Sequence, residues 1–312
     1  MHSTKIKNFF IKQYEKPFRK LTLADRPWVE TCCLKDGNLS SHVNFPMMYM
    51  VQAAYPGDLF REFCGCVVKK PWIDNNTLFC QYPIGKPENR VRALRRIKTL
   101  YAGKCAKMAF GGLSEQNVEE IKSVFGDEKV TIEHCEDNDN YILDVQEQIQ
   151  LEGPQYHNRR KKIGRFNRTY NWTYEPITKE NMQCCLDVNE QWFSYHTDLD
   201  GAIKEQCILK VGLQELDELK LQGGLFRIDG KPVAIYIGTP FNEEVYLSLF
   251  MKADNSYPDI SLVFTHEFFK INCQGFRYDN EDSDVGLEGL RKFKTNLHPV
   301  FMVKLYNAEV LL

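Results

Sequence analysis

The sequence lacks the features that mark membrane and secreted proteins. No apolar run approaches the roughly 20 residues that a membrane-spanning helix needs. The basic N-terminal residues Lys5, Lys7 and Lys12 are not followed by an apolar segment, so we predict no secretory signal peptide. The sequence also has no large excess of one charge, since it contains 40 Lys and Arg residues and 42 Asp and Glu residues. Any binding of nucleic acid or of a membrane surface must therefore come from a local patch. Together these absences predict a cytoplasmic protein without stable membrane insertion.

The eleven cysteines lack the spacing of a metal site or of a disulfide framework. No CxxC motif occurs, and no paired Cys and His spacing suits tetrahedral zinc, so we expect no metal. The odd count and the adjacent pairs Cys32-Cys33 and Cys184-Cys185 argue against disulfides. We expect most of these thiols to behave as small buried hydrophobic groups. A catalytic cysteine is disfavoured because none lies in a recognisable nucleophile context.

The clearest pattern of secondary structure lies between Gly223 and Tyr306. Two turn signals, Asp229-Gly230 and Pro240-Phe241-Asn242, separate three strands. A helix, a short strand, a second helix and a last strand follow. The expected ranges are 223–228, 232–239, 243–252, 260–272, 276–278, 285–296 and 299–306. The order is therefore β-β-β-α-β-α-β.

Two successive parts of the chain have similar element orders. Upstream of Gly223 we expect a strand at 173–177 and helices at 179–195 and 201–221, with Thr178 capping the first helix. The first 145 residues predict the order β-α-α-β-β-α-β-α-β-β. This similarity suggests a tandem duplication, with a degenerate first domain at 1–145 and a second at 171–312. A basic connecting helix at 146–170 joins them.

The order of the second half is that of the GNAT acyltransferase fold, in which a donor binds between two splayed central strands. Four motifs also occur in a family-like order, namely HNRRKKIGRFNRTY, YEPIT, GGLFRIDGKPVAIYIG and NEDSDVGLEGLRKFKTNLHPVF. Together they resemble the soluble C-terminal domain of phosphatidylglycerol lysyltransferases, over about residues 15–306. The resemblance implies an α/β protein of tandem GNAT-like domains. Each domain would be a mixed, mostly antiparallel sheet flanked by helices, related to the Fem-type peptidyltransferases.

The resemblance also implies an activity. Members of this group transfer an aminoacyl group from charged tRNA, and GNAT enzymes transfer an acyl group from coenzyme A. We therefore expect an acyl-CoA or aminoacyl-tRNA donor and an amine or hydroxyl acceptor on a small molecule, a peptide or a lipid headgroup. The alternative is a catalytically silent relative that binds a nucleotide, coenzyme A or tRNA.

The donor site implied by the fold lies where the third strand meets the next helix. Free N–H groups and the positive end of the dipole make a helix N-terminus suitable for a pyrophosphate. Backbone N–H groups of the strand would stabilise an oxyanion. The loop before the helix lacks the RxxGxG/A pattern, and Asp254, Pro258 and Asp259 disfavour phosphate there, so a plain connection is the alternative. The predicted donor-binding residues are Leu249, Phe250, Met251, Tyr257, Ile260, Ser261 and Lys294.

An acidic segment, Asp279 to Asp284, precedes the last helix. Four carboxyl groups this close cannot all stay ionised cheaply if buried, so one of them would have a raised pKa and could act as a base. The predicted catalytic residues are Glu281 and Asp282, with their neighbour Asn280. The alternative is an acid-rich helix cap, which we favour for Asp284. Many GNAT enzymes have a tyrosine acid near this helix, where this chain has Phe293.

The connecting helix carries the strongest concentration of positive charge. Contact with the phosphates of tRNA or of a nucleotide donor is one interpretation, and a solvated interdomain helix is the other. A second basic helix is expected at 88–101. Arg291 could hold a phosphate or carboxylate in a bidentate manner. The predicted polyanion contacts are His157, Arg159, Arg160, Lys161, Arg165 and Arg291.

Overall fold

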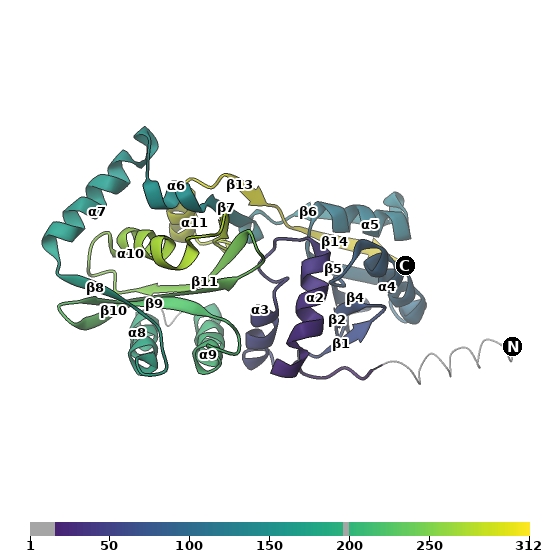
Figure 1. The fold of residues 1–312 in the computed structure, drawn as a ribbon. Coiled ribbons are helices and arrows are strands. Elements are labelled where there is room, and N and C mark those ends of the chain that lie inside the picture. Colours follow the sequence, from purple (N-terminus) through teal and green to yellow (C-terminus); the bar gives the residue numbers. More distant parts are fainter. Residues whose placement is uncertain (1–15, 196–199) are drawn as a thin grey trace, which may run out of the picture. The chain divides into compact units, whose positions relative to one another are not determined.

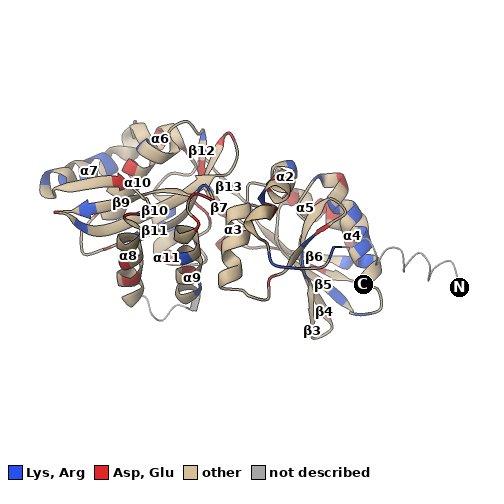
Figure 2. Cartoon of the chain, turned by 60° about the horizontal axis from the view of Figure 1, so that its bottom comes forward, with Lys and Arg blue, Asp and Glu red and all other residues tan. Residues whose placement is uncertain are grey.

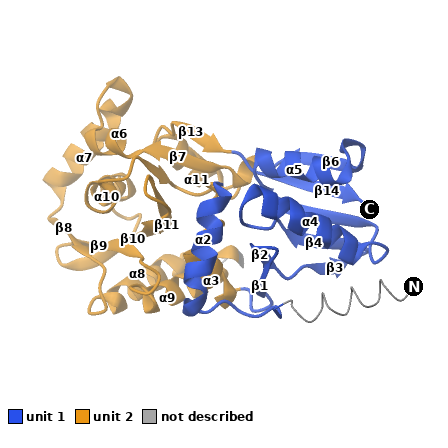
Figure 3. Ribbon diagram, turned by 45° about the vertical axis from the view of Figure 1, so that its right-hand side comes forward, with its two compact units in different colours: residues 1–38, 55–135, 304–312 blue, residues 39–54, 136–303 orange. Residues whose placement is uncertain are grey.

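The computed structural model describes residues 16–195 and 200–312, which fold into two compact units (Figures 1 and 3). The first unit contains residues up to 38, 55–135 and 304–312. The second unit contains residues 39–54 and 136–303. The two domains expected from the sequence follow the order of elements along the chain. The compact units differ from those domains, because residues 39–54 belong to the second unit and residues 304–312 belong to the first. Within the described residues, no helix has the length and hydropathy needed to cross a membrane.

The first unit is built on a five-stranded sheet in the order β3-β4-β5-β14-β6. Only β4 and β5 run parallel. The C-terminal strand β14 fills the place between β5 and β6. The strands are β3 (Trp72–Asp74), β4 (Thr77–Gln81), β5 (Lys107–Leu113), β6 (Val130–His134) and β14 (Tyr306–Leu311), beside a hairpin of β1 (Phe60–Phe63) and β2 (Cys66–Lys69). The main helices are α2 (Arg26–Asp36), α4 (Pro87–Tyr101) and α5 (Glu115–Phe125).

A buried ion cluster joins these three helices. Arg90 of α4 is 1% exposed and contacts Glu120 of α5 at 2.5 Å and Asp36 of α2 at 2.9 Å. Tyr82 donates a further hydrogen bond of 2.8 Å to Glu120. A buried ion pair adds little net stability, but removal of one partner leaves an uncompensated buried charge. Arg90 is therefore the residue on which this cluster depends.

Arg90→Met is expected to lower the free energy of unfolding by about 3–5 kcal/mol, because Asp36 and Glu120 lose their shared counter-charge. Arg95→Met is the matched control, since Arg95 lies on the exposed face of the same helix. Urea denaturation followed by circular dichroism measures both variants. Equal costs for the two substitutions would contradict the assigned role of Arg90.

The second unit is built on a seven-stranded sheet in the order β13-β7-β12-β11-β10-β9-β8. Only β11 and β12 pair in parallel. The strands are β7 (Asn140–Asp144), β8 (Trp172–Pro176), β9 (Gln222–Ile228), β10 (Lys231–Pro240), β11 (Val245–Ala253), β12 (Tyr278–Asn280) and β13 (Phe301–Val303). This architecture confirms the expected mixed, mostly antiparallel sheets flanked by helices.

Helices cover both faces of this sheet (Figure 1). One face carries α6 (Val145–Gln150), α7 (His157–Thr169) and α10 (Ile260–Phe268), which ends in a π-helical turn. The other face carries α8 (Met182–Ser194) and α9 (Asp200–Gln214), and α3 (Phe45–Met50) packs on α9. The core on the α10 face is aromatic: Tyr236 stacks on Phe268 with 3.9 Å between ring centroids, and Phe226 and Phe264 adjoin them. α11 (Glu288–Thr295) follows β12.

Local signals predicted the meander β9-β10-β11 well. At its first turn Asp229 and Gly230 both have positive φ, 48° and 79°, which these residue types tolerate. Other expectations need correction. The connecting segment contains two helices, α6 and α7, because Leu151 adopts a left-handed conformation between them. The last strand, expected at 299–306, is split into β13 and β14.

The short strand after α10 was predicted two residues too early. It lies at Tyr278–Asn280, so Asp279 and Asn280 belong to a strand and not to the loop that their composition suggested. The reason is tertiary pairing. β12 lies between β11 and β7, and both ladders satisfy its backbone despite its low intrinsic β-propensity.

Candidate active site

The two central strands of the second unit separate after a short ladder. β11 pairs with β12 only from Val245 to Leu247, and then continues to Ala253 without a partner on that side. On its other side a β-bulge interrupts the pairing with β10, because Ile237 faces Phe250 whereas Gly238 faces Ser248. Leu249 is therefore the extra residue. An open strand edge with a bulge is where a sheet offers free backbone groups to a ligand.

The bulge also changes which face each side chain of β11 occupies. Tyr246 and Met251 both contact α10, through the Phe268 ring and Thr265 respectively, although they are five residues apart. Strict alternation would put them on opposite faces. After the bulge, Phe250 and Lys252 therefore point to the face covered by α8 and α9. A bulge was not predicted from the sequence.

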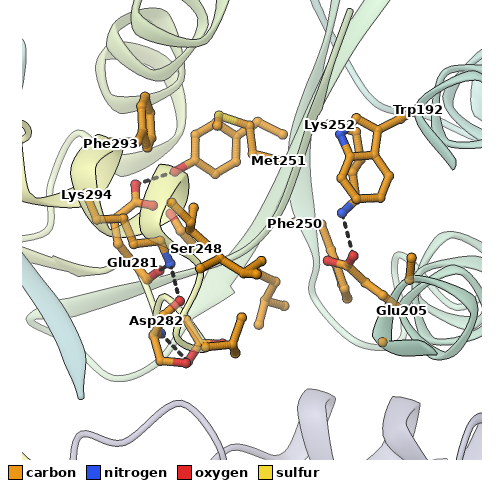
Figure 4. Close-up of a pocket in the computed structure, with 18 residues that line it drawn as sticks. Trp192, Glu205, Ser248, Phe250, Met251, Lys252, Glu281, Asp282, Phe293 and Lys294 are labelled. Carbon is orange, nitrogen blue, oxygen red and sulfur yellow. Dashed lines mark hydrogen bonds and ion pairs between the residues drawn. The ribbon is translucent and has the colours of Figure 1, made fainter. Parts of the chain in front are cut away.

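A cavity of about 560 Å³ adjoins this open edge. Figure 4 shows its side chains on both sides of β11. Its walls come from α8, α9, β10, β11, the acidic segment and α11. The lining residues are Trp192, Gly201, Ala202, Glu205, Tyr236, Ser248, Leu249, Phe250, Met251, Lys252, Glu281, Asp282, Ser283, Val285, Leu287, Leu290, Phe293 and Lys294. The structure thus brings together six of the predicted residues: Leu249, Phe250, Met251, Glu281, Asp282 and Lys294.

Glu281 is the most strongly buried carboxyl group of this cavity, with 7% of the residue exposed. Tyr236 donates a short hydrogen bond to its carboxylate. Burial raises the pKa of Glu281, and the charges of Lys294 and Arg159 and the bond from Tyr236 oppose that rise. Asp279 lies two residues earlier on β12, is fully buried, and accepts a hydrogen bond of 3.0 Å from Ser248. Burial, and then the charge of Glu281, raise the pKa of Asp279 well above its usual range.

Lys294 joins α11 to the acidic segment. Its ammonium is buried and donates to the carbonyl oxygens of Glu281 and Ser283, the latter at 2.7 Å. An ammonium has three N–H donors, so one remains for the neighbouring carboxylate or for a ligand. The pair of Glu281 and Lys294 therefore places a proton acceptor and a cationic donor at one end of the cavity.

Asp282 and Asn280 are held by a polar network that the sequence did not reveal. Asp282 has a left-handed backbone, φ 58°, and its carboxylate accepts from Ser41 at 2.7 Å and from Asn140 at 3.3 Å. Asn280 is fully buried, donates to the carbonyl of Leu39 at 2.7 Å, and does not line the cavity. Asn280 thus fixes the backbone of the segment. Ser41 and Asn140 are far away in the sequence, and no local pattern identifies them.

The opposite side of β11 carries a second polar group, formed by Lys252, Glu205 and Trp192 (Figure 4). Lys252 Nζ lies 2.6 Å from Glu205 Oε2 and 3.7 Å from the centroid of the Trp192 ring. Sequence reasoning missed all three residues. They come from three different elements, and only the fold brings them together.

The N-terminus of α10 differs from the phosphate site that the fold resemblance implied. Its cap residue, Asp259, forms ion pairs with Lys162 at 3.2 Å and with Arg165. Although burial opposes the change, these bonds lower the pKa of Asp259, so a carboxylate occupies the helix end. Ile260 is buried and Tyr257 packs on Tyr170. Tyr257, Ile260 and Ser261 do not line the cavity.

Some of the predicted polyanion contacts are exposed, and some already form hydrogen bonds or ion pairs within the protein. His157, Arg160, Lys161 and Arg165 are exposed on α7, one of the two basic helices visible in Figure 2. Arg160 also donates to the carbonyls of Leu151 and Gly153. Arg159 is 6% exposed and bonds to Gln148.

Arg291 is engaged by carboxylates and not by an open site. It binds Asp284 with two hydrogen bonds of 2.9 and 3.0 Å, and Asp137 at 2.5 Å. Among the described residues, no group of His, Cys, Asp and Glu has the arrangement of a metal site.

The buried carboxyl groups predict a pH-dependent stability. Folded Asp279 keeps its proton well above pH 4, whereas the unfolded side chain loses its proton near pH 4. The folded state therefore binds more protons, and its stability falls as pH rises from about 4 to the folded pKa of Asp279. Asp279→Asn removes this contribution. The stability of the variant relative to wild type should increase between pH 5 and pH 8 in urea denaturation.

Asp217→Asn is the control for this comparison, because the Asp217 side chain is 69% exposed and pairs with Lys179 at the surface. This variant tests whether loss of an exposed surface carboxyl group produces the same trend. A constant difference between Asp279→Asn and wild type from pH 5 to pH 8 would show that Asp279 is not held protonated.

Comparison with known proteins places this geometry in a family. The model of the C-terminal domain of phosphatidylglycerol lysyltransferase matches residues 65–309. A conserved protein of unknown function from Bacteroides thetaiotaomicron superposes with a TM-score of 0.85 at 26% identity, covering 94% of this chain and 99% of that chain. No curated protein matches the chain significantly.

Two further solved structures share the fold alone. The C-terminal domain of a putative lysylphosphatidylglycerol synthetase from Agrobacterium fabrum has a TM-score of 0.67 at 15% identity, covering 92% of each chain. FemX has a TM-score of 0.57 at 10% identity, covering 95% of this chain and 98% of that chain. These likenesses confirm the expected fold, which the chain shares with FemX and with the synthetase domain. The match over most of its length shows that the chain belongs to the family of phosphatidylglycerol lysyltransferase C-terminal domains.

Proposed function

We propose that the chain transfers an aminoacyl group from charged tRNA to an amine or hydroxyl acceptor, at the end of the cavity formed by Glu281 and Lys294. One observation carries this proposal. A buried carboxyl group of raised pKa and a buried ammonium line one cavity at the open edge of β11. Membership of a transferase family supports the same class of reaction.

The helix end at Asp259 favours tRNA over coenzyme A as the donor. A pyrophosphate at the N-terminus of α10 would meet the Asp259 carboxylate, which Arg165 and Lys162 already hold. The exposed cations of α7 suit the spaced phosphates of a nucleic acid instead. Acyl-CoA is therefore the alternative donor, and the binding experiment below includes it.

The reaction assigns one task to each polar group of the cavity. The acceptor attacks the ester carbonyl of the aminoacyl-tRNA while its proton passes to Glu281. The bond between the carbonyl carbon and the ribose oxygen then breaks, and Glu281 returns the proton to that oxygen. The remaining N–H of Lys294 and the backbone groups released by the bulge at Leu249 stabilise the negative charge on the carbonyl oxygen.

Glu281 suits the role of base better than Asp282. A base of raised pKa binds the acceptor's proton more strongly and still ionises as the pH rises. Asp282 Oδ1 already accepts hydrogen bonds from Ser41, Asn140 and the backbone of Ser283. Those bonds occupy this oxygen and fix the orientation of the carboxylate, so Asp282 is a positioning group of the segment.

The test uses total tRNA charged with labelled amino acids, offered with primary amines, alcohols, short peptides and phosphatidylglycerol vesicles. Glu281→Gln should lower the transfer rate at least about 100-fold and leave the affinity for charged tRNA nearly unchanged. Glu288→Gln, an exposed neighbour outside the cavity, is the control. Full turnover in Glu281→Gln would remove Glu281 as base.

Donor binding is measured by calorimetric titration with charged tRNA, coenzyme A and acetyl-CoA. Binding of acetyl-CoA without binding of charged tRNA would contradict the proposed donor. If charged tRNA binds but no acceptor in the panel receives the label, the chain is instead a binding module.

The exposed side chains of α7 predict a salt-dependent contribution to tRNA binding. Replacing Lys161 and Arg168 together by Ala should weaken binding and reduce the slope of log Kd against log salt concentration by about 1–2. The matched control replaces Lys210 and Lys292, which are exposed on other helices. Filter binding at several salt concentrations measures these slopes. Equal slopes for the two double variants would exclude α7 as the contact.

A further inference from the structure

The chain's own lysine occupies a complete cation site inside the cavity. The ammonium of Lys252 lies over the Trp192 ring at 3.7 Å and contacts the Glu205 carboxylate at 2.6 Å. The Lys252 side chain is 5% exposed, whereas that of Glu205 is 36% exposed. An aromatic face with an adjacent carboxylate is the combination that binds an ammonium ligand. Here both partners are already engaged.

This arrangement is a consequence of the bulge at Leu249. Without that extra residue, Lys252 would point toward α10 and its aromatic core. With it, Lys252 lies opposite Ile235 of β10 and faces Trp192 on α8 and Glu205 on α9. Burial lowers the pKa of Lys252, and Glu205 opposes that change. A buried ammonium is costly unless it is paired, and Glu205 and the Trp192 ring supply that pairing at the wall of the cavity.

An incoming cation would meet two obstacles at this end of the cavity. Glu205 is neutralised by Lys252, and a second positive charge beside Lys252 would be repelled. On this side of β11 the cavity is also lined by uncharged residues, Phe250 from β11 and Gly201 and Ala202 from α9. A neutral aliphatic group would bury its surface there without leaving any polar atom unpaired.

We propose that Lys252 is a specificity-determining residue that restricts this end of the cavity to uncharged, apolar acyl or aminoacyl side chains and excludes cationic ones. The inference rests on the proposed function, which puts the transferred group in this cavity. The family description names lysyl transfer, and Lys252 gives this chain a different preference. The ammonium of a lysyl group would have to displace that of Lys252 from both Trp192 and Glu205.

The experiment compares two small amides by binding alone. L-norleucinamide and L-lysinamide share the α-ammonium and the four-carbon side chain, and differ in the terminal ammonium. Wild type should bind norleucinamide at least about tenfold more tightly than lysinamide. Lys252→Met removes the ammonium that contacts the Glu205 carboxylate and the face of the Trp192 ring, and should therefore increase lysinamide affinity at least about tenfold. Two-dimensional NMR titration measures the dissociation constants.

Two further variants make the result specific. Adding Glu205→Gln to Lys252→Met should abolish the gain in lysinamide affinity, because the carboxylate is lost. Lys292→Met, an exposed lysine outside the cavity, should behave as wild type. Circular dichroism verifies that Lys252→Met is folded, and Met keeps most of the buried aliphatic stem.

Each outcome decides the proposal. Equal or tighter lysinamide binding by wild type, no gain in Lys252→Met, a gain that survives Glu205→Gln, or no binding of either amide by any variant would overturn it. The amide series does not involve tRNA or transfer. If the predicted amide preference is found and charged tRNA does not bind, the specificity of the cavity stands and the proposed donor fails.

Discussion

The burial of two carboxyl groups, Asp279 and Glu281, two residues apart at the end of β12, is the constraint on which the second unit depends. Such a pair is tolerated only if its charge is limited and its oxygens are bonded. Protonation of Asp279 meets the first condition, because burial raises its pKa well above the usual range. Ser248 donates to Asp279 Oδ1 and Tyr236 donates to the Glu281 carboxylate, whereas Asp279 Oδ2 has no partner among the described residues. Lys294 donates to the backbone carbonyl of Glu281. The carboxyl pair therefore ties β10, β11, β12 and α11 into one arrangement.

The two ends of the cavity carry different polar groups. β12 pairs with β11 for only three residues, so the carboxyl of Glu281 lies where the strands diverge and a ligand can reach it. The bulge at Leu249 then directs Lys252 to the other face of the sheet, where it meets Trp192 and Glu205. We propose that the first end serves proton transfer and charge stabilisation and that the second selects the transferred group. Asn140 and Ser41 donate hydrogen bonds to Asp282 and thereby fix the position of its carboxylate in the acidic segment.

Short-range sequence signals predicted helices and strands. The arrangement of the site depends on the pairing of strands that are distant in the sequence. The turn at Asp229-Gly230, the meander that follows and the acidic segment all carry short-range signals, and each was recognised. The position of β12 was two residues wrong because a strand with low propensity is stabilised by its neighbours. The group of Lys252, Trp192 and Glu205 could not be predicted, since a one-residue bulge determines which face Lys252 occupies. Motif resemblance identified the family, and the sequence already indicated that Asp259 disfavours phosphate at the end of α10. It did not reveal the ion pairs of Asp259 with Lys162 and Arg165.

The central claim is that Glu281 is a buried base whose pKa lies above that of an ordinary glutamate. Carbon-13 NMR titration of glutamate-labelled protein measures it directly, with Glu281→Gln used to assign the carboxyl signal. The account predicts a midpoint clearly above the usual value of about 4.3. It also predicts a further rise in Lys294→Met, because the opposing positive charge is removed. A midpoint at or below 4.3 in wild type, or no response to Lys294→Met, would contradict the account.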